Sequence, residues 1–148
     1  MSWKELKIAS PDLAEFGMRR FASEVAYLGT IKKDGSPRVH PVTPIIGADR
    51  LLLFMEPKSP KGHDLRRDGR YALHCSVANS SGGGGEFLIT GTARHTKDAE
   101  ARSLAIKSAS YEIEERYVLF ELGIDSAFSN IYDDDGPPIQ SRWNRAEG

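Results

Sequence analysis

The residues best placed to do chemistry in this sequence are Ser59, Pro60 and Lys61. Serine is a favoured N-cap residue and proline a favoured first helical residue, so the run predicts the start of a short helix. The first amides of a helix have no partner inside it and can bind an anion, to which a serine hydroxyl and a lysine ammonium would add a hydrogen bond and a charge. The alternative is an ordinary helix cap with a solvated lysine. Spacing alone leaves both interpretations open.

The other reactive residue types form no constellation that could catalyse a reaction unaided. The four histidines show none of the spacings typical of metal ligands, and the chain has a single cysteine. The acidic run 133–135 lacks the glutamate that would close a calcium loop, and no G-x-S-x-G nucleophile motif is present. The glycines at 82–85 precede a predicted strand rather than a helix, which indicates a hairpin loop and not a dinucleotide-binding turn. Any redox chemistry would therefore have to come from a cofactor.

Composition restricts the class of protein. The length of 148 residues, with 39% hydrophobic and 28% charged residues, is typical of one globular domain spanning 1–148. The sequence contains neither an apolar leader nor a stretch of about 20 apolar residues, so we expect a cytoplasmic protein. A net charge of −1 provides no general attraction to nucleic acid or to a membrane, and neither is expected as a partner. Cys75 lies in an apolar run and is interpreted as a buried core residue.

The elements that must position Lys61 follow from periodicity and from turn residues. Ser10 and Pro11 predict the start of a helix that runs to about Phe21, and Asp34-Gly35 predicts a tight hairpin. Further helices are expected at about 59–67 and 98–109. Strands are expected at 25–32, 38–46, 51–56, 70–77, 86–95 and 117–124. The remainder is interpreted as an acidic turn at 133–138 and a tail around Arg142–Arg145.

Two of the expected strands carry information about the sheet. The strand 25–32 has apolar residues in both alternating sets, which predicts burial on both faces. The strand 38–46 contains Pro41 and Pro44, each lacking a ladder donor, so it must have an open edge or a bulge. Strands joined directly by hairpins indicate an antiparallel sheet. We predict a mainly β (α+β) fold, an antiparallel split β-barrel of about six or seven strands with two or three peripheral helices.

The order of these pieces resembles a known family, the pyridoxamine 5′-phosphate oxidase-like flavoproteins. The resemblance extends from about Val25 to Ala93 and more weakly over Tyr117–Leu122. The residues that carry it are Asp34-Gly35-Ser36-Pro37, Val39-His40-Pro41-Val42-Thr43, Ser59-Pro60-Lys61-Gly62-His63 and Arg70-Tyr71-Ala72-Leu73. The ordered set is considerably more specific than any one member of it.

The resemblance implies FMN as the cofactor, with a deazaflavin as an alternative, and it assigns roles by position. Ser59 and Lys61 would hold the phosphate, with His40 close to it. The family often has arginine at the position of His40 and a second cation at that of Pro60, so a histidine here makes phosphate binding weaker or more dependent on pH. The residues implied near the ring and ribityl chain are Pro41, Val42, Thr43, Phe54, Met55 and Glu86.

Members of this family are homodimers with two cofactors at the interface, and the resemblance implies the same here. Trp143 and Arg145 would then reach the flavin of the partner subunit; the alternative for Trp143 is a hydrophobic anchor at the dimer seam. True vitamin B6 oxidases end in Arg-Leu-x-Pro, whereas this chain has Trp143-Asn144-Arg145-Ala146. Vitamin B6 phosphate is therefore not expected as the substrate.

Four functional hypotheses follow. The first is an FMN-dependent oxidoreductase acting on a small molecule that the sequence does not identify, and the second is a deazaflavin-dependent reductase. The third is a non-catalytic module that binds flavin or haem, for which His40 and His63 are the motivation. The fourth is a degenerate, empty pocket, because His40, Pro60 and Glu86 all reduce its attraction for a phosphate.

Overall fold

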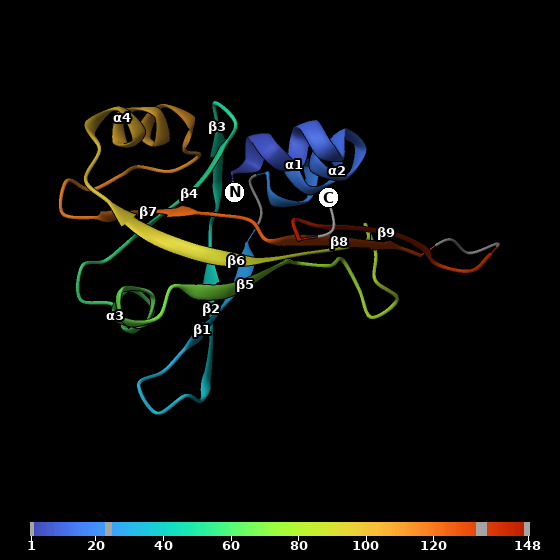
Figure 1. The fold of residues 1–148 in the computed structure, drawn as a ribbon, viewed down its shortest axis with the longest axis horizontal. Helices are drawn as coiled ribbons and strands as arrows, with labels where there is room; N and C mark the ends of the chain where they lie inside the picture. The colour runs from blue at the N-terminus through green and yellow to red at the C-terminus, as the bar shows by residue number, and fades with distance from the viewer. Residues whose placement is uncertain (1, 23–24, 133–135, 147–148) are drawn as a thin grey trace.

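The computed structural model describes residues 2–22, 25–132 and 136–146, and within them the chain forms four helices and nine strands (Figure 1). The acidic run 133–135 lies outside the described residues. The helices are α1 (Trp3–Ala9), α2 (Pro11–Phe21), α3 (Pro60–Arg67) and α4 (Ala99–Ser108). The strands are β1 (Ala26–Ile31), β2 (Pro37–Val42), β3 (Ile45–Gly47), β4 (Arg50–Met55), β5 (Arg70–Cys75), β6 (Glu86–Thr96), β7 (Val118–Leu122), β8 (Ser126–Ile131) and β9 (Ile139–Asn144).

All the strand pairs are antiparallel, and the long strand β6 joins two parts of the sheet. One part has the order β2-β1-β5-β6-β8-β9 and the other the order β6-β7-β4-β3. Figure 1 shows β6 as a long curved strand crossing the middle of the molecule. The fold is therefore mainly β, a curled antiparallel sheet of the split-barrel type, as the sequence predicted.

The sheet divides at Gly91, where β6 changes partners. Thr90 pairs with Ser126 of β8, and Ala93 pairs with Leu122 of β7. A Cβ atom at Gly91 would come within 1.9 Å of the carbonyl oxygen of Gly123, so only glycine lets the connecting backbone pass this closely. This close approach lets the single strand β6 pair with β8 in one part of the sheet and with β7 in the other.

The main core lies between the concave face of the sheet and the N-terminal helices. Phe87 of β6 is fully buried and makes edge-to-face contacts with Trp3, Phe16 and Phe21. A second, smaller core lies where α4 covers β3, β4 and β7, with Phe54 and Leu119 among its members. Cys75 is 2% exposed, which confirms its interpretation as a core residue.

The N-terminal helices differ from the prediction in two details. Helix α2 has the predicted bounds, but the Ser10 side chain makes no capping hydrogen bond. Helix α1 was not predicted, because it is only seven residues long and its inward positions are just Trp3 and Leu6. Both side chains are buried in the main core, so α1 is held by packing rather than by local propensity.

Strand β1 corrects the expectation of burial on both faces. Its inward side chains are buried, whereas Tyr27 on the other face is 46% exposed. Strand β2 pairs only with β1 and so has the open edge that its proline required. The segment expected as a single strand from Arg38 to Ile46 is two strands, since Thr43 and Pro44 lie in neither ladder.

The C-terminal region corrects a second expectation, because it forms strands β8 and β9 rather than an irregular tail. Both were hidden by their composition: Ser129 and Asn130 are buried polar residues of β8, and β9 is polar and largely exposed. A hydrophobic alternation that would signal a strand is therefore absent. Trp143 lies on β9, where it pairs with Ala127.

Candidate functional site

Helix α3 begins as the sequence predicted. The Ser59 hydroxyl accepts a 3.2 Å hydrogen bond from the amide of Gly62, and Pro60 occupies the first helical position. Ser59 is 9% exposed, so its hydroxyl is fixed at the edge of the protein interior. This hydroxyl can still donate its own proton to an oxygen placed beside the helix start.

Lys61 supplies a positive charge that has no direct hydrogen-bond or ion-pair partner among the described residues. Its side chain is partly buried, and burial lowers the pKa of its ammonium, with Glu56 opposing that shift. A cation that has lost part of its hydration without gaining a partner favours a bound anion.

Lys61 opens into a shallow pocket of about 240 Å³ between β2, β4 and the segment that precedes β7. The pocket wall combines residues from the end of β2 with the apolar end of β4. Six predicted residues meet here: Pro41, Val42, Thr43, Phe54, Met55 and Lys61. Three further lining residues were not predicted: Glu56, Tyr111 and Tyr117.

His40 lies beside this pocket, on the inward face of β2. Its Nε2 atom is buried and has no hydrogen-bond partner in the described part of the chain. Burial, Lys61 and Arg38 lower the pKa of His40, while Asp64 acts in the opposite direction. These influences favour the neutral form of the imidazole, and the charge of Lys61 is one of them.

Arg38 and Asp64 form a partly buried ion pair that acts on His40 and that was not predicted from the sequence. Asp64, 2% exposed, accepts hydrogen bonds from Arg38 at 2.7 Å and from Thr30 at 2.8 Å. A third, at 2.9 Å, comes from Arg67. These contacts tie helix α3 to β1 and β2, so they fix Lys61 relative to His40. A signal was present in the sequence, because a charged residue on the inward side of a strand needs a partner.

Three predicted site residues, Trp143, Arg145 and Glu86, lie away from the pocket of their own chain. His40 and Trp143 occupy the same row of the sheet, but four strands separate β2 from β9. At about 4.8 Å per strand spacing, the two residues lie roughly 24 Å apart along the sheet. Arg145 is on the same distant side, where it forms a 3.3 Å ion pair with Asp125.

Glu86 is also away from the pocket and has partners of its own. Tyr132 and Asn130 donate hydrogen bonds to its carboxylate at 2.8 and 3.0 Å and hold the pKa of Glu86 below its usual value. His74 lies 3.8 Å from the same carboxylate. These contacts make Glu86 a structural group within one chain.

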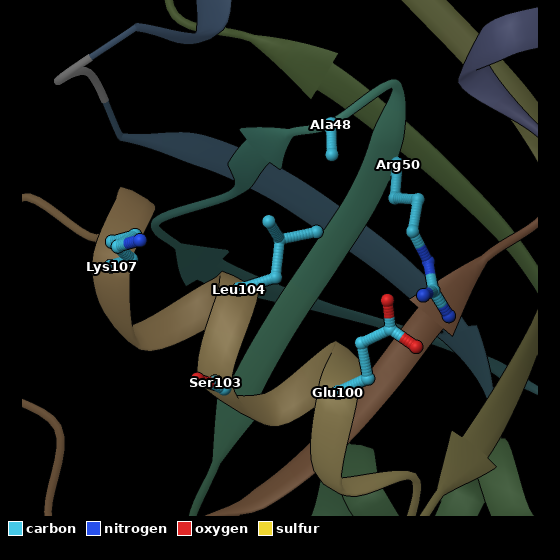
Figure 2. A pocket seen from close by; sticks show the side chains of 6 residues that line it. All are labelled: Ala48, Arg50, Glu100, Ser103, Leu104 and Lys107. Carbon is cyan, nitrogen blue, oxygen red and sulfur yellow. The ribbon is translucent and has the colours of Figure 1, made fainter.

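A larger hollow, of about 510 Å³, lies between the β3–β4 hairpin and α4 (Figure 2). Figure 2 shows the guanidinium of Arg50 directed toward the carboxylate of Glu100. Arg50 already makes two hydrogen bonds with Glu121, at 2.9 and 2.7 Å. None of the predicted site residues lines this hollow, and of its two cations, Arg50 and Lys107, Arg50 is already paired with Glu121, so the smaller pocket at Lys61 is the better candidate.

Among the described residues, no group of three or more histidine, cysteine or acidic side chains is arranged to hold a metal ion. None of the helices in the described ranges has the length and apolar character required to cross a bilayer.

Solved structures with the same fold include proteins with different reported ligands. A heme-binding protein from Mycobacterium smegmatis superposes with a TM-score of 0.66 at 16% identity, covering 86% of this chain and 56% of its own. A NimC/NimA family protein from Clostridium acetobutylicum gives 0.62 at 17% identity, covering 97% and 95%. PhzG from Burkholderia lata, in complex with tetrahydrophenazine-1-carboxylic acid, gives 0.57 at 14% identity, covering 95% and 92%.

At these identities the structural likeness establishes the fold alone. This chain spans little more than half the length of the heme-binding protein. No protein of curated function is significantly similar in sequence. The sequence profile of pyridoxamine 5′-phosphate oxidase, however, matches residues 17–130, which include both strands and the helix that form the pocket. The chain therefore belongs to the pyridoxamine 5′-phosphate oxidase family.

Proposed function

We propose that this protein binds FMN at the Lys61 pocket and uses it as an oxidoreductase acting on a small molecule. The observation that carries the proposal is the convergence of an unpaired, partly buried ammonium, a helix start and an open strand edge on one pocket with a mixed polar and apolar lining. The ammonium and the helix start suit a phosphate, and the open strand edge offers the main-chain donors and acceptors that the polar edge of a flavin ring requires.

The residues present fit each part of the cofactor. The Lys61 ammonium and backbone amide and the Ser59 hydroxyl would hold the phosphate, with His40 beside it. Pro60 has no N–H, and the Gly62 amide already donates to Ser59. Main-chain groups of Val42, at the end of β2, and of Thr43, which follows the strand and lies in neither ladder, would meet the polar edge of the ring. Phe54 and Met55 would cover apolar parts of the ring and the ribityl chain. The flavin would supply the redox chemistry, because the pocket contains no pair of side chains arranged as nucleophile and base.

The pocket of one chain is smaller than the roughly 300–1,000 Å³ typical of small-molecule sites. This supports a homodimer in which a second copy completes the site. The outward face of the sheet carries apolar side chains suited to that contact, among them Tyr27 at 46% and Val39 at 66% exposed. Trp143, Arg145 and Glu86, which lie away from the pocket of their own chain, are proposed to approach that of the partner.

Flavin titration tests the proposal. The full chain should quench FMN fluorescence with saturable binding, and Lys61→Gln should weaken FMN binding by about ten- to a hundredfold, as expected for a charged hydrogen bond. Riboflavin, which lacks the phosphate, should bind the two proteins equally. Lys58→Gln is the matched control, since Lys58 is exposed and lies outside the pocket. Equal FMN affinity in wild type and Lys61→Gln would refute the phosphate site.

The second candidate is a haem-binding module, favoured by the fold shared with the heme-binding protein. His63 is exposed on α3, and the Nε2 atom of His40 has no partner among the described residues. A Soret band that appears on haem addition and disappears in His63→Ala would support this candidate. Bound flavin that turns over with a reductant would argue against it. Titrating FMN and a deazaflavin in parallel separates the two flavin alternatives.

A further inference from the structure

The segment 109–117, between α4 and β7, forms one wall of the Lys61 pocket, and helix α4 holds it in place. The guanidinium of Arg102 donates hydrogen bonds to the carbonyl of Tyr117 at 2.7 Å and to that of Glu115 at 2.9 Å. A longer bond, of 3.4 Å, reaches the carbonyl of Glu114. One side chain therefore fixes the backbone of the whole turn.

Arg102 also packs its guanidinium against the ring of a pocket residue, Phe54. Its guanidinium carbon lies 5.2 Å from the centroid of the Phe54 ring, and Phe54 lines the pocket. Arg102 thus lies behind the pocket wall, where it links the ring of β4 to the turn that carries Tyr117.

A second clamp holds the outer end of this wall. Arg116 makes a bidentate contact with Glu56, its Nη2 donating at 2.6 Å and its Nε at 3.0 Å. Its guanidinium also lies over the Tyr117 ring, 5.2 Å from the centroid. Arg102 therefore holds the backbone of Tyr117, and Arg116 packs against its ring. Such a constraint lowers the entropy cost of placing the ring against a ligand.

Tyr111 and Tyr117 face the pocket together. Both line it with Lys61, and Tyr111 remains 36% exposed. Burial, with a smaller contribution from Tyr117, raises the pKa of the Tyr111 hydroxyl. A pair of phenol rings beside an apolar wall provides flat surface and hydroxyl donors, a combination suited to a planar ring with polar edges.

We propose that Tyr111 and Tyr117 contact the planar ring of the bound ligand, and that Arg102 acts as the positioning residue for Tyr117. The inference rests on the proposed function, since Lys61 must hold a phosphate for the ring to lie here. The pocket then selects phosphate esters that carry a planar ring system and discriminates against those that lack one. This selectivity belongs to a segment outside both strands of the predicted site.

Paired titrations with FMN and riboflavin test the ring contact. Tyr117→Leu and Tyr111→Leu should each weaken FMN and riboflavin by the same factor, about five- to tenfold for the loss of an aromatic contact. Tyr117→Phe, which keeps the ring, should bind both within about twofold of wild type. Lys61→Gln, in contrast, should weaken FMN alone. Arg94→Gln is a control, because Arg94 is exposed and bonds only Glu121 among the described residues.

The role of Arg102 is tested by asking whether the losses of flavin affinity in the Arg102 and Tyr117 variants add in the double variant. Arg102→Gln should weaken both flavins about as much as Tyr117→Leu, and the double variant should bind like Tyr117→Leu alone. Additive losses would assign Arg102 a merely structural role. If wild type binds FMN but the leucine variants bind it equally well, the ring contact is wrong while the proposed function stands. If wild type binds neither flavin, the proposed function itself fails.

Discussion

The carboxylate of Asp64, on α3, accepts a 2.7 Å hydrogen bond from Nε of Arg38, on β2. Asp64 is almost fully buried, whereas the Arg38 side chain is 30% exposed. The contact joins the helix that carries Lys61 to the strand that carries His40. The position of Lys61 relative to His40, the two side chains proposed to meet the phosphate, therefore depends on a pair of residues that lies outside the pocket.

Asp64→Asn should lower the free energy of unfolding by about 2 kcal/mol. The variant weakens three charge-assisted or buried hydrogen bonds, but Arg38 and Arg67 can partly regain water, which reduces the loss. Urea unfolding followed by circular dichroism measures the change. Asp68→Asn is the matched control: Asp68 pairs with exposed Arg70, and its loss should leave the unfolding midpoint unchanged within error.

The contribution of Asp64 should also depend on pH. Burial opposes ionisation of Asp64, but hydrogen bonds from Thr30, Arg38 and Arg67 outweigh it, so its folded pKa lies below the ordinary value of 3.8. A carboxyl with a lowered folded pKa stabilises the fold fully above its unfolded pKa and loses that contribution as pH falls through the folded value. The gap between wild type and Asp64→Asn should be constant from pH 5 to 7 and shrink below about pH 4. A gap that widens in acid would contradict this assignment.

FMN binding should involve proton uptake at His40. Burial, Lys61 and Arg38 keep the pKa of free His40 below 6.5, and a bound phosphate dianion would raise it. Binding therefore favours the protonated imidazole: the contribution of His40 is largest below its free pKa and falls as pH rises through its pKa in the complex. The phosphate has its own second pKa of about 6, which acts in the opposite direction, so the comparison must be made with a variant.

The affinity advantage of wild type over His40→Gln should grow by up to about tenfold between pH 8 and pH 5.5. Fluorescence titrations of FMN across this range measure it. His95→Gln is the control: burial also lowers the pKa of His95, but the cations that act on it are Arg66 and Lys97 and not Lys61. An advantage that does not vary with pH would mean that His40 does not titrate on binding.

The outward face of the sheet should be the homodimer contact. Val39→Asp places a charge at a position that is 66% exposed in one chain, and burying that charge against a partner would be unfavourable. Wild type should sediment as a dimer, and the variant should shift toward the monomer and bind FMN more weakly. Ile8→Asp changes an equally exposed residue of α1 and should leave the dimer intact. A monomeric wild type that binds FMN fully would contradict the proposal.

Local patterns in the sequence were sufficient for much of the fold. Helix α3 was predicted from Ser59 and Pro60 because capping and the fixed backbone angle of proline are properties of adjacent residues. The open edge of β2 followed in the same way from Pro41, which cannot donate to a ladder. The meeting of Pro41, Phe54 and Lys61 in one pocket followed from the family resemblance rather than from spacing.

The tertiary structure decided what depends on partners distant in the chain. The polar strand β9 is held by its pairing with β8. Residues 139–144 show no alternation of apolar and polar side chains that would predict a strand. The carbonyl of the pocket residue Tyr117 accepts a hydrogen bond from Arg102 of α4, and Asp64 reaches Arg38 across 26 positions of sequence. Capping and turn formation act between neighbouring residues and can be read from the sequence. Burial, pKa shifts and pocket walls depend on which surfaces the fold brings together.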